Sequence, residues 1–111
     1  MTRLLAADAE GIAAAAALLS GGELVGMPTE TVYGLAGLAY DERAVARIFA
    51  AKERPTFDPL IVHLPDRERL AEVAVVEGVA HLDRLLDAFW PGPLTVVLPR
   101  TARVPDLVAS G

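Results

Sequence analysis

Two threonines, a glutamate and a tyrosine stand close together between two apolar runs near the start of the chain. The segment Met27-Pro-Thr-Glu-Thr-Val-Tyr-Gly-Leu-Ala36 offers two hydroxyls, a carboxylate and a phenol. Pro28 has no N–H to donate, so a β-ladder that contains the preceding residues should end there. Polar side chains held at the end of a strand are typical of small-molecule sites. The pattern also fits a capped turn in which Thr29 and Thr31 bond to the backbone and Tyr33 is a half-buried core aromatic.

A second candidate group is basic and ends a predicted helix. Lys52 and Arg54 are followed by a proline and then by Asp58. Arginine offers a rigid bidentate fork and lysine a mobile point charge, which together suit phosphate or carboxylate oxygens. The alternative is that the pair only complements the negative end of the helix dipole. Two other arginines, Arg67 and Arg84, are expected on outward helix faces.

Two further polar residues lie in predicted strands. His63 belongs to the run Leu60–Leu64, and Thr95 belongs to the run Leu94–Leu98 that follows the rigid turn Trp90–Pro93. A lone histidine in an apolar strand is more often a core residue than a catalyst, and no neighbouring His or Cys completes a metal site. The alternative is that Trp90–Pro93 is only a tight connection, in which Trp90 covers the hydrophobic core.

Composition excludes several classes of site. With 10 basic and 15 acidic side chains the net charge is −5, so no global basic field is available to hold nucleic acid. The absence of cysteine excludes disulfides, thiolate metal sites and a cysteine nucleophile. No P-loop or Rossmann glycine pattern occurs. No signal peptide or membrane-length apolar run is present, which predicts a soluble, cytoplasmic chain without a membrane partner.

Helices and strands alternate along the chain, which predicts an α/β fold. Aspartates at positions 8, 41 and 66 are expected to cap helices, because their side chains can accept hydrogen bonds from the first helical N–H groups. The expected helices are residues 8–19, 41–54, 66–73 and 79–89, with a short one near 104–110. The expected strands are residues 24–27, 60–64 and 94–98, with a further apolar stretch at 35–38. So few short strands would leave open sheet edges, which is typical of part of a longer domain.

Four motifs, taken in order, resemble the YrdC-type threonylcarbamoyl-adenylate synthase family. They are Pro28–Leu35, Lys52-x-Arg54-Pro55, Pro59–His63 and Trp90–Thr95, and the resemblance spans roughly residues 10–111. It implies a YrdC/RibB-like α/β fold with a twisted mixed sheet flanked by helices around a basic-lined cavity. On this resemblance, residues 1–111 are the amino-terminal part of a single YrdC-like domain that is truncated here.

The resemblance also implies an activity, namely L-threonylcarbamoyladenylate synthase. Such enzymes join L-threonine, bicarbonate and ATP into threonylcarbamoyl-AMP and pyrophosphate, and a partner transferase then modifies tRNA. The residues that would contact threonine are Thr31, Tyr33 and His63. The residues that would contact the nucleotide are Lys52, Arg54, Asp58 and Thr95. Lys52 and Arg54 would be catalytic because two anions must meet, and Mg²⁺ would arrive with ATP rather than at a dedicated metal site.

Asp58 departs from the family pattern, which often has asparagine there. An ionised aspartate only accepts hydrogen bonds and repels phosphate, so Asp58 would accept from adenine or ribose or act through magnesium-bound water. Two other functions stay open. One is a related carbamoyl-adenylate enzyme, although such chains usually carry zinc-finger-like cysteines. The other is an RNA-binding YrdC-like module with a tRNA contact. The negative net charge argues against RNA binding as its main function.

Overall fold

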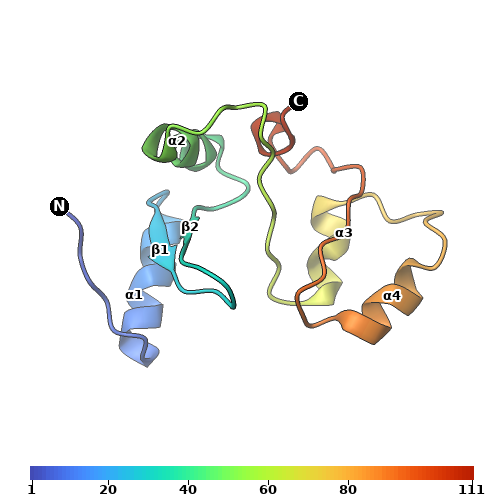
Figure 1. The fold of residues 1–111 in the computed structure, drawn as a ribbon, viewed down its shortest axis with the longest axis horizontal. Coiled ribbons are helices and arrows are strands. Elements are labelled where there is room, and N and C mark those ends of the chain that lie inside the picture. The colour runs from blue at the N-terminus through green and yellow to red at the C-terminus, as the bar shows by residue number, and fades with distance from the viewer. The chain divides into compact units, whose positions relative to one another are not determined.

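The computed structural model describes residues 1–111, which divide into two units, Met1–Asp58 and Pro59–Gly111 (Figure 1). The elements of the first unit are α1 (Ala9–Ser20), β1 (Val25–Met27), β2 (Gly34–Ala36) and α2 (Glu42–Lys52). Those of the second are the 3₁₀ helix η1 (Arg67–Arg69), α3 (Leu70–Val73), α4 (Leu82–Phe89) and the 3₁₀ helix η2 (Asp106–Ala109). No helix is long and apolar enough to cross a membrane. That all of these residues belong to one domain stays a prediction.

Aspartate caps begin both helices of the first unit, as predicted. The Asp8 carboxylate accepts a hydrogen bond from the N–H of Gly11 at 2.8 Å, and that of Asp41 accepts from the N–H of Arg43 at 2.9 Å. Each bond satisfies an N–H for which the helix itself has no acceptor. Gly22, with a φ of +85°, follows α1 in the left-handed conformation that glycine adopts without strain.

The sheet of the first unit is an antiparallel pair, β1 with β2. Its register pairs Val25 with Ala36 and Met27 with Gly34, so the ladder stops before Pro28 as the sequence predicts. The buried residues of α2 are Ala44, Val45, Ile48 and Phe49, which form the predicted apolar side of that helix.

Gly37 lets the chain leave β2 close to α2. A Cβ atom at this position would lie 3.0 Å from Cδ2 of Leu24 and 3.2 Å from Cδ1 of Ile48. Such distances are tighter than ordinary van der Waals contact, so a larger residue would require the side chains of Leu24 and Ile48 to shift. The glycine therefore allows these side chains to pack closely against the chain after β2.

In the second unit, α3 is tied to the segment that follows Pro99. The N–H of Val75 donates to the carbonyl oxygen of Pro99 at 2.7 Å, and the N–H of Thr101 donates to that of Val73 at 2.9 Å. Between these bonds Ala74 and Arg100 form an isolated antiparallel bridge. Two segments 24 or more residues apart in the sequence are thus held together by backbone bonds.

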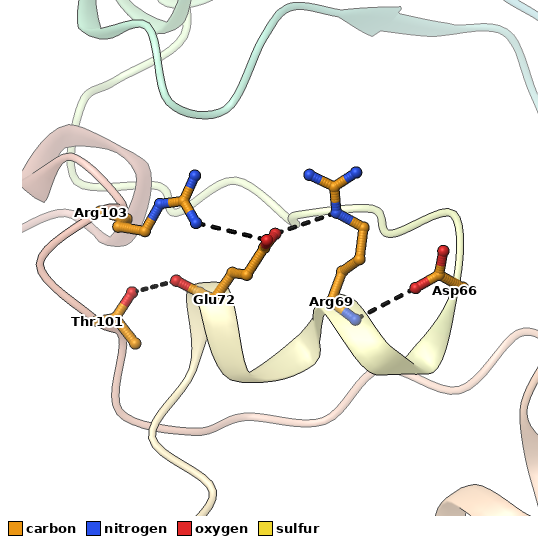
Figure 2. A network of polar contacts seen from close by, with 5 residues as sticks. All are labelled: Asp66, Arg69, Glu72, Thr101 and Arg103. Atoms are coloured by element: carbon orange, nitrogen blue, oxygen red, sulfur yellow. Dashed lines mark hydrogen bonds and ion pairs between the residues drawn. The ribbon is translucent and has the colours of Figure 1, made fainter.

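Glu72 of α3 strengthens this connection (Figure 2). Its carboxylate accepts from Nε of Arg69 at 3.0 Å and lies 3.5 Å from Nη1 of Arg103, and its carbonyl oxygen accepts from the hydroxyl of Thr101. The Asp66 carboxylate accepts from the N–H of Arg69 at 3.2 Å, which confirms its predicted role as a cap. Glu72 therefore joins α3 to Thr101 and Arg103, two residues of the segment that follows Pro99.

Arg67 forms ion pairs that its predicted place on an outward helix face did not indicate. Its guanidinium forms ion pairs with Asp87 and Asp83, the latter at 2.7 Å. These carboxylates are four residues apart on α4 and lie on one helix face. The hydrogen bonds that Arg67 donates to Asp87 and Asp83 raise the pKa of its guanidinium. Arg67 thus ties η1 to α4, whereas Arg84 is exposed as predicted.

Two predicted strands, Leu60–Leu64 and Leu94–Leu98, are neither helix nor strand in the structure. A strand requires a neighbour that pairs with its N–H and C=O groups. Residues 1–111 supply no such ladder, although the N–H of Leu60 bonds to Val108. The predicted mixed sheet is therefore wrong for these residues, where the sheet has two antiparallel strands. The α/β class, with helices and a sheet, is confirmed.

The fourth predicted helix begins three residues later than expected. The chain reaches Leu82 before α4 starts, because His81 has a φ of +64°. That left-handed conformation cannot form part of a right-handed helix.

Candidate functional site

The turn between β1 and β2, residues 28–33, is built around the hydroxyl of Thr29. Its Oγ1 accepts from the N–H of Thr31 at 3.3 Å and from the N–H of Val32 at 3.2 Å, and it donates to the carbonyl oxygen of Val32. Threonine hydroxyls that bond to backbone two and three residues ahead are a recurrent way to fix a turn. The capped-turn interpretation is therefore correct for Thr29.

The same interpretation is wrong for Tyr33. Its side chain is 79% exposed, so it is not a half-buried core aromatic. The hydroxyl of Thr31 is also exposed, and it lies 3.5 Å from that of Thr29. The turn thus presents a hydroxyl and a phenol to solvent from a backbone that is held in place.

The end of α2 positions the basic pair. Lys52 is the last residue of the helix, and Glu53 follows in the left-handed conformation with a φ of +51°. The N–H of Arg54 then bonds back to the carbonyl oxygen of Phe49 at 3.0 Å, and that of Glu53 to Ala50 at 3.3 Å. These are the bonds of a Schellman-type helix end. The fixed backbone turns the chain sharply between the two basic side chains.

Arg54 is also joined to the turn that follows it. Its Nε lies at a long hydrogen-bond distance, 3.5 Å, from the carbonyl oxygen of Asp58. The N–H of Asp58 bonds to the carbonyl oxygen of Pro55 at 3.1 Å, which closes residues 55–58 into a turn. Arg54 is half-buried while Lys52 and Asp58 are exposed. A guanidinium and an ammonium group thus stand at one helix end, which suits an anionic ligand.

In the second unit, His63 and Thr95 are both exposed. Exposure alternates along both predicted strand runs, and these two residues fall on the exposed positions. His63 is therefore not a satisfied core histidine. Its Nδ1 lies 3.3 Å from the carbonyl oxygen of Ile61, which leaves Nε2 as the atom directed away from this local contact.

The turn before Thr95 is rigid. The indole N–H of Trp90 donates to the carbonyl oxygen of Leu94 at 2.9 Å, and the N–H of Leu94 donates to that of Gly92 at 2.9 Å. A Cβ atom at Gly92 would lie 2.5 Å from the carbonyl oxygen of Phe89, so only glycine fits there. Trp90 is half-buried. The backbone that carries Thr95 is thus fixed by side-chain and main-chain bonds.

An open hollow of about 290 Å³ lies on this turn and is lined by Phe89, Pro93 and Leu94. Its lining is apolar and includes none of the predicted site residues. The structure brings no three His, Cys, Asp or Glu side chains together as a metal site. The candidate site residues are polar side chains on turns and at a helix end.

The predicted site residues are divided between the two units. The first unit carries five of them, namely Thr31, Tyr33, Lys52, Arg54 and Asp58. The second carries His63 and Thr95. That these residues converge on one ligand stays a prediction.

Sequence reasoning missed the left-handed Glu53, because a glutamate does not signal that conformation. The capped-turn hypothesis gave backbone bonds to both Thr29 and Thr31, and the sequence does not single out Thr29.

Comparisons with known proteins point to one family. The family model named Sua5/YciO/YrdC, with the description "Telomere recombination", matches residues 17–111. A threonylcarbamoyl-AMP synthase of Pyrococcus abyssi is 50% identical over 97 residues, which are 87% of this chain and 28% of that protein. One of Bacillus subtilis is 48% identical over 90 residues, which are 79% of this chain and 25% of that protein. This chain thus spans about a quarter of the length of these relatives.

Solved structures agree with this result. The crystal structure of P. abyssi Sua5 complexed with L-threonine matches with a TM-score of 0.87 and 45% identity, over 99% of this chain and 31% of that one. The H234A/Y235A variant of the same protein matches with a TM-score of 0.87 and 47% identity, over 94% and 32%. The family model matches residues 17–111, and the two relatives are 48–50% identical to this chain over most of its length. The chain therefore belongs to the Sua5/YciO/YrdC family.

Proposed function

We propose that this chain supplies part of the site in which L-threonine, bicarbonate and ATP are converted into threonylcarbamoyl-AMP and pyrophosphate. The observation that carries the proposal is the 50% identity with the P. abyssi threonylcarbamoyl-AMP synthase over 87% of the chain. The match to a Sua5 structure that contains L-threonine supports threonine as the amino acid.

The proposed chemistry has two steps. The threonine amine attacks the carbon of bicarbonate and water is lost, which gives a carbamate. A carbamate oxygen then attacks the α-phosphorus of ATP, an O–P bond forms, and the bond to pyrophosphate breaks. Both reactants of the second step are anions, so positive charge near the reacting oxygens lowers the barrier.

Lys52 and Arg54 are proposed to supply this charge. The Schellman-type end of α2 holds their backbone, and Nε of Arg54 lies 3.5 Å from the carbonyl oxygen of Asp58. A donor whose backbone is already in place needs less reorganisation when charge develops on the phosphate. Asp58 is proposed to accept a hydrogen bond from adenine or ribose, since its carboxylate would repel phosphate. Thr95 is proposed to contact the nucleotide from its rigid turn.

Threonine is proposed to meet the exposed hydroxyl of Thr31, the phenol of Tyr33 and the imidazole of His63. A polar amino acid with a hydroxyl, an amine and a carboxylate needs several directed partners, and these three groups supply donors and acceptors. All three are exposed rather than buried in the core, so each can reach a ligand.

Magnesium is proposed to enter with ATP. Asp58 is the one carboxylate in the proposed nucleotide set. The ion would neutralise part of the phosphate charge when bound. The product is proposed to pass to a transferase that modifies tRNA in the cytoplasm, with direct tRNA contact as a further proposal.

The test is a chimera in which the 97 aligned residues of the P. abyssi synthase are replaced by those of this chain. We expect threonine- and bicarbonate-dependent release of pyrophosphate from ATP, which Arg54→Ala abolishes. A folded chimera with no activity beside an active parent would contradict the proposal. Binding of tRNA with a steep salt dependence and no pyrophosphate release would favour the RNA-binding alternative.

A further inference from the structure

We propose that Thr29 is a positioning residue, which holds the β1–β2 turn so that Thr31 can face the substrate L-threonine. The proposal rests on the function proposed above. It gives the two threonines of the turn different roles. The sequence alone does not distinguish these roles.

The hydrogen bonds of Thr29 use the full capacity of its hydroxyl. A hydroxyl has one proton to donate and two lone pairs to accept with. Thr29 Oγ1 donates to the carbonyl oxygen of Val32 and accepts from the N–H groups of Thr31 and Val32 at 3.3 and 3.2 Å. No donor or acceptor remains on this hydroxyl for a ligand.

The hydroxyl of Thr31 differs from that of Thr29 in its hydrogen bonding. Its backbone N–H is satisfied by Thr29, and its own hydroxyl lies 3.5 Å from Oγ1 of Thr29. That distance gives at most a weak hydrogen bond, and the Thr29 hydroxyl is already saturated. The hydroxyl of Thr31 can therefore bond to a ligand while its backbone is held still.

The methyl group of Thr29 lies near the start of β2. A Cβ atom built on Gly34, the first residue of that strand, would lie 3.6 Å from Cγ2 of Thr29. Two substitutions separate these features, since Thr29→Val keeps the methyl group without the hydroxyl and Thr29→Ser keeps the hydroxyl without the methyl group.

The first experiment needs no enzyme activity. Amide hydrogen exchange is measured by NMR in residues 1–111 for the parent chain, Thr29→Val and Thr29→Ser. We expect the amides of Thr31 and Val32 to exchange about 10-fold faster in Thr29→Val and at the parental rate in Thr29→Ser. Thr31→Val serves as the control, since it should leave both amides protected.

The second experiment uses the chimera with the P. abyssi synthase. Thr29→Val should raise the KM for L-threonine about 10- to 100-fold with a much smaller change in kcat, because the hydroxyl of Thr31 is misplaced. Thr29→Ser should restore the KM to within about 3-fold of the parent. The KM for ATP should not change in either variant, since the nucleotide residues lie on other turns.

Unchanged amide exchange and an unchanged KM in Thr29→Val would overturn the proposal. Equal damage from Thr29→Ser would also overturn it, since the methyl group rather than the hydroxyl would then matter. If Thr29→Val fails to fold, parental rates in Thr29→Ser together with slowed exchange of both amides in the parent chain support the assignment. An inactive chimera with the expected exchange pattern would reject the proposed function and leave the assignment of the turn intact.

Discussion

The indole N–H of Trp90 donates a hydrogen bond to the carbonyl oxygen of Leu94, 2.9 Å away. This bond spans a turn that contains two prolines and a glycine, and it ends immediately before Thr95. The indole N–H of Trp90 thus stabilises the turn, and part of the ring is buried. The position of Thr95 depends on a side chain five residues earlier in the sequence.

Replacing Trp90 by phenylalanine keeps an aromatic ring and removes the donor. We expect a loss of about 1 kcal/mol in the free energy of unfolding, because the carbonyl oxygen of a half-buried residue loses its partner. Urea denaturation of residues 1–111 measures this. Phe57→Leu is the control, since that ring is exposed, and its effect should stay within about 0.5 kcal/mol. Equal losses in both variants would contradict the role of the indole N–H.

Arg54→Ala in the chimera should lower the rate of pyrophosphate release by about 10²- to 10³-fold, because one oriented donor to transition-state charge is lost. Arg54→Lys should recover only part of the rate, since a point charge does not reproduce the guanidinium fork. Arg84→Ala is the matched control and should leave the rate unchanged. Similar small effects from Arg54→Ala and Arg84→Ala would reject the catalytic assignment.

Arg67→Ala should lower the urea midpoint of residues 1–111, because it removes the ion pairs with Asp87 and Asp83. Added salt should shrink the difference, since the pairs are largely exposed. The pKa of Arg67 is raised, so its contribution is fully present below the ordinary arginine pKa and is lost only as the pH rises through the raised value. The difference from the parent should therefore be constant from about pH 6 to pH 10. A difference that fell steadily across this range would contradict the assignment.

Residues 1–111 by themselves should self-associate and show no synthase activity. The runs around Ile61 and Val97 lack a strand partner, and these side chains are 62% and 95% exposed. Sedimentation velocity should show oligomers that the double change Ile61→Thr and Val97→Thr reduces. Ile12→Thr is the control, because that residue is equally exposed but lies on a helix whose backbone is paired. A monodisperse monomer with robust activity would refute both expectations.

The sequence by itself determined the elements whose signals are local. Asp8, Asp41 and Asp66 cap helices where predicted, since a carboxylate and the N–H that it accepts from are two or three residues apart. Pro28 ended the ladder for an equally local reason, the missing N–H. The candidate site residues were also named from short motifs, and their role in binding stays a prediction.

Only the tertiary structure decided which residues find partners far along the chain. Leu60–Leu64 and Leu94–Leu98 have the composition of strands, but a strand forms only where another segment pairs with its backbone. Arg67 and Arg84 look alike in sequence, and only Arg67 meets the two aspartates of α4. Thr29 and Thr31 also look alike in sequence, although here the bonds are local. A hydroxyl can form only three hydrogen bonds, and in the folded turn the hydroxyl of Thr29 forms all three. Local chemistry thus fixes where elements begin and end, whereas partners are chosen by the geometry that brings distant groups within bonding distance.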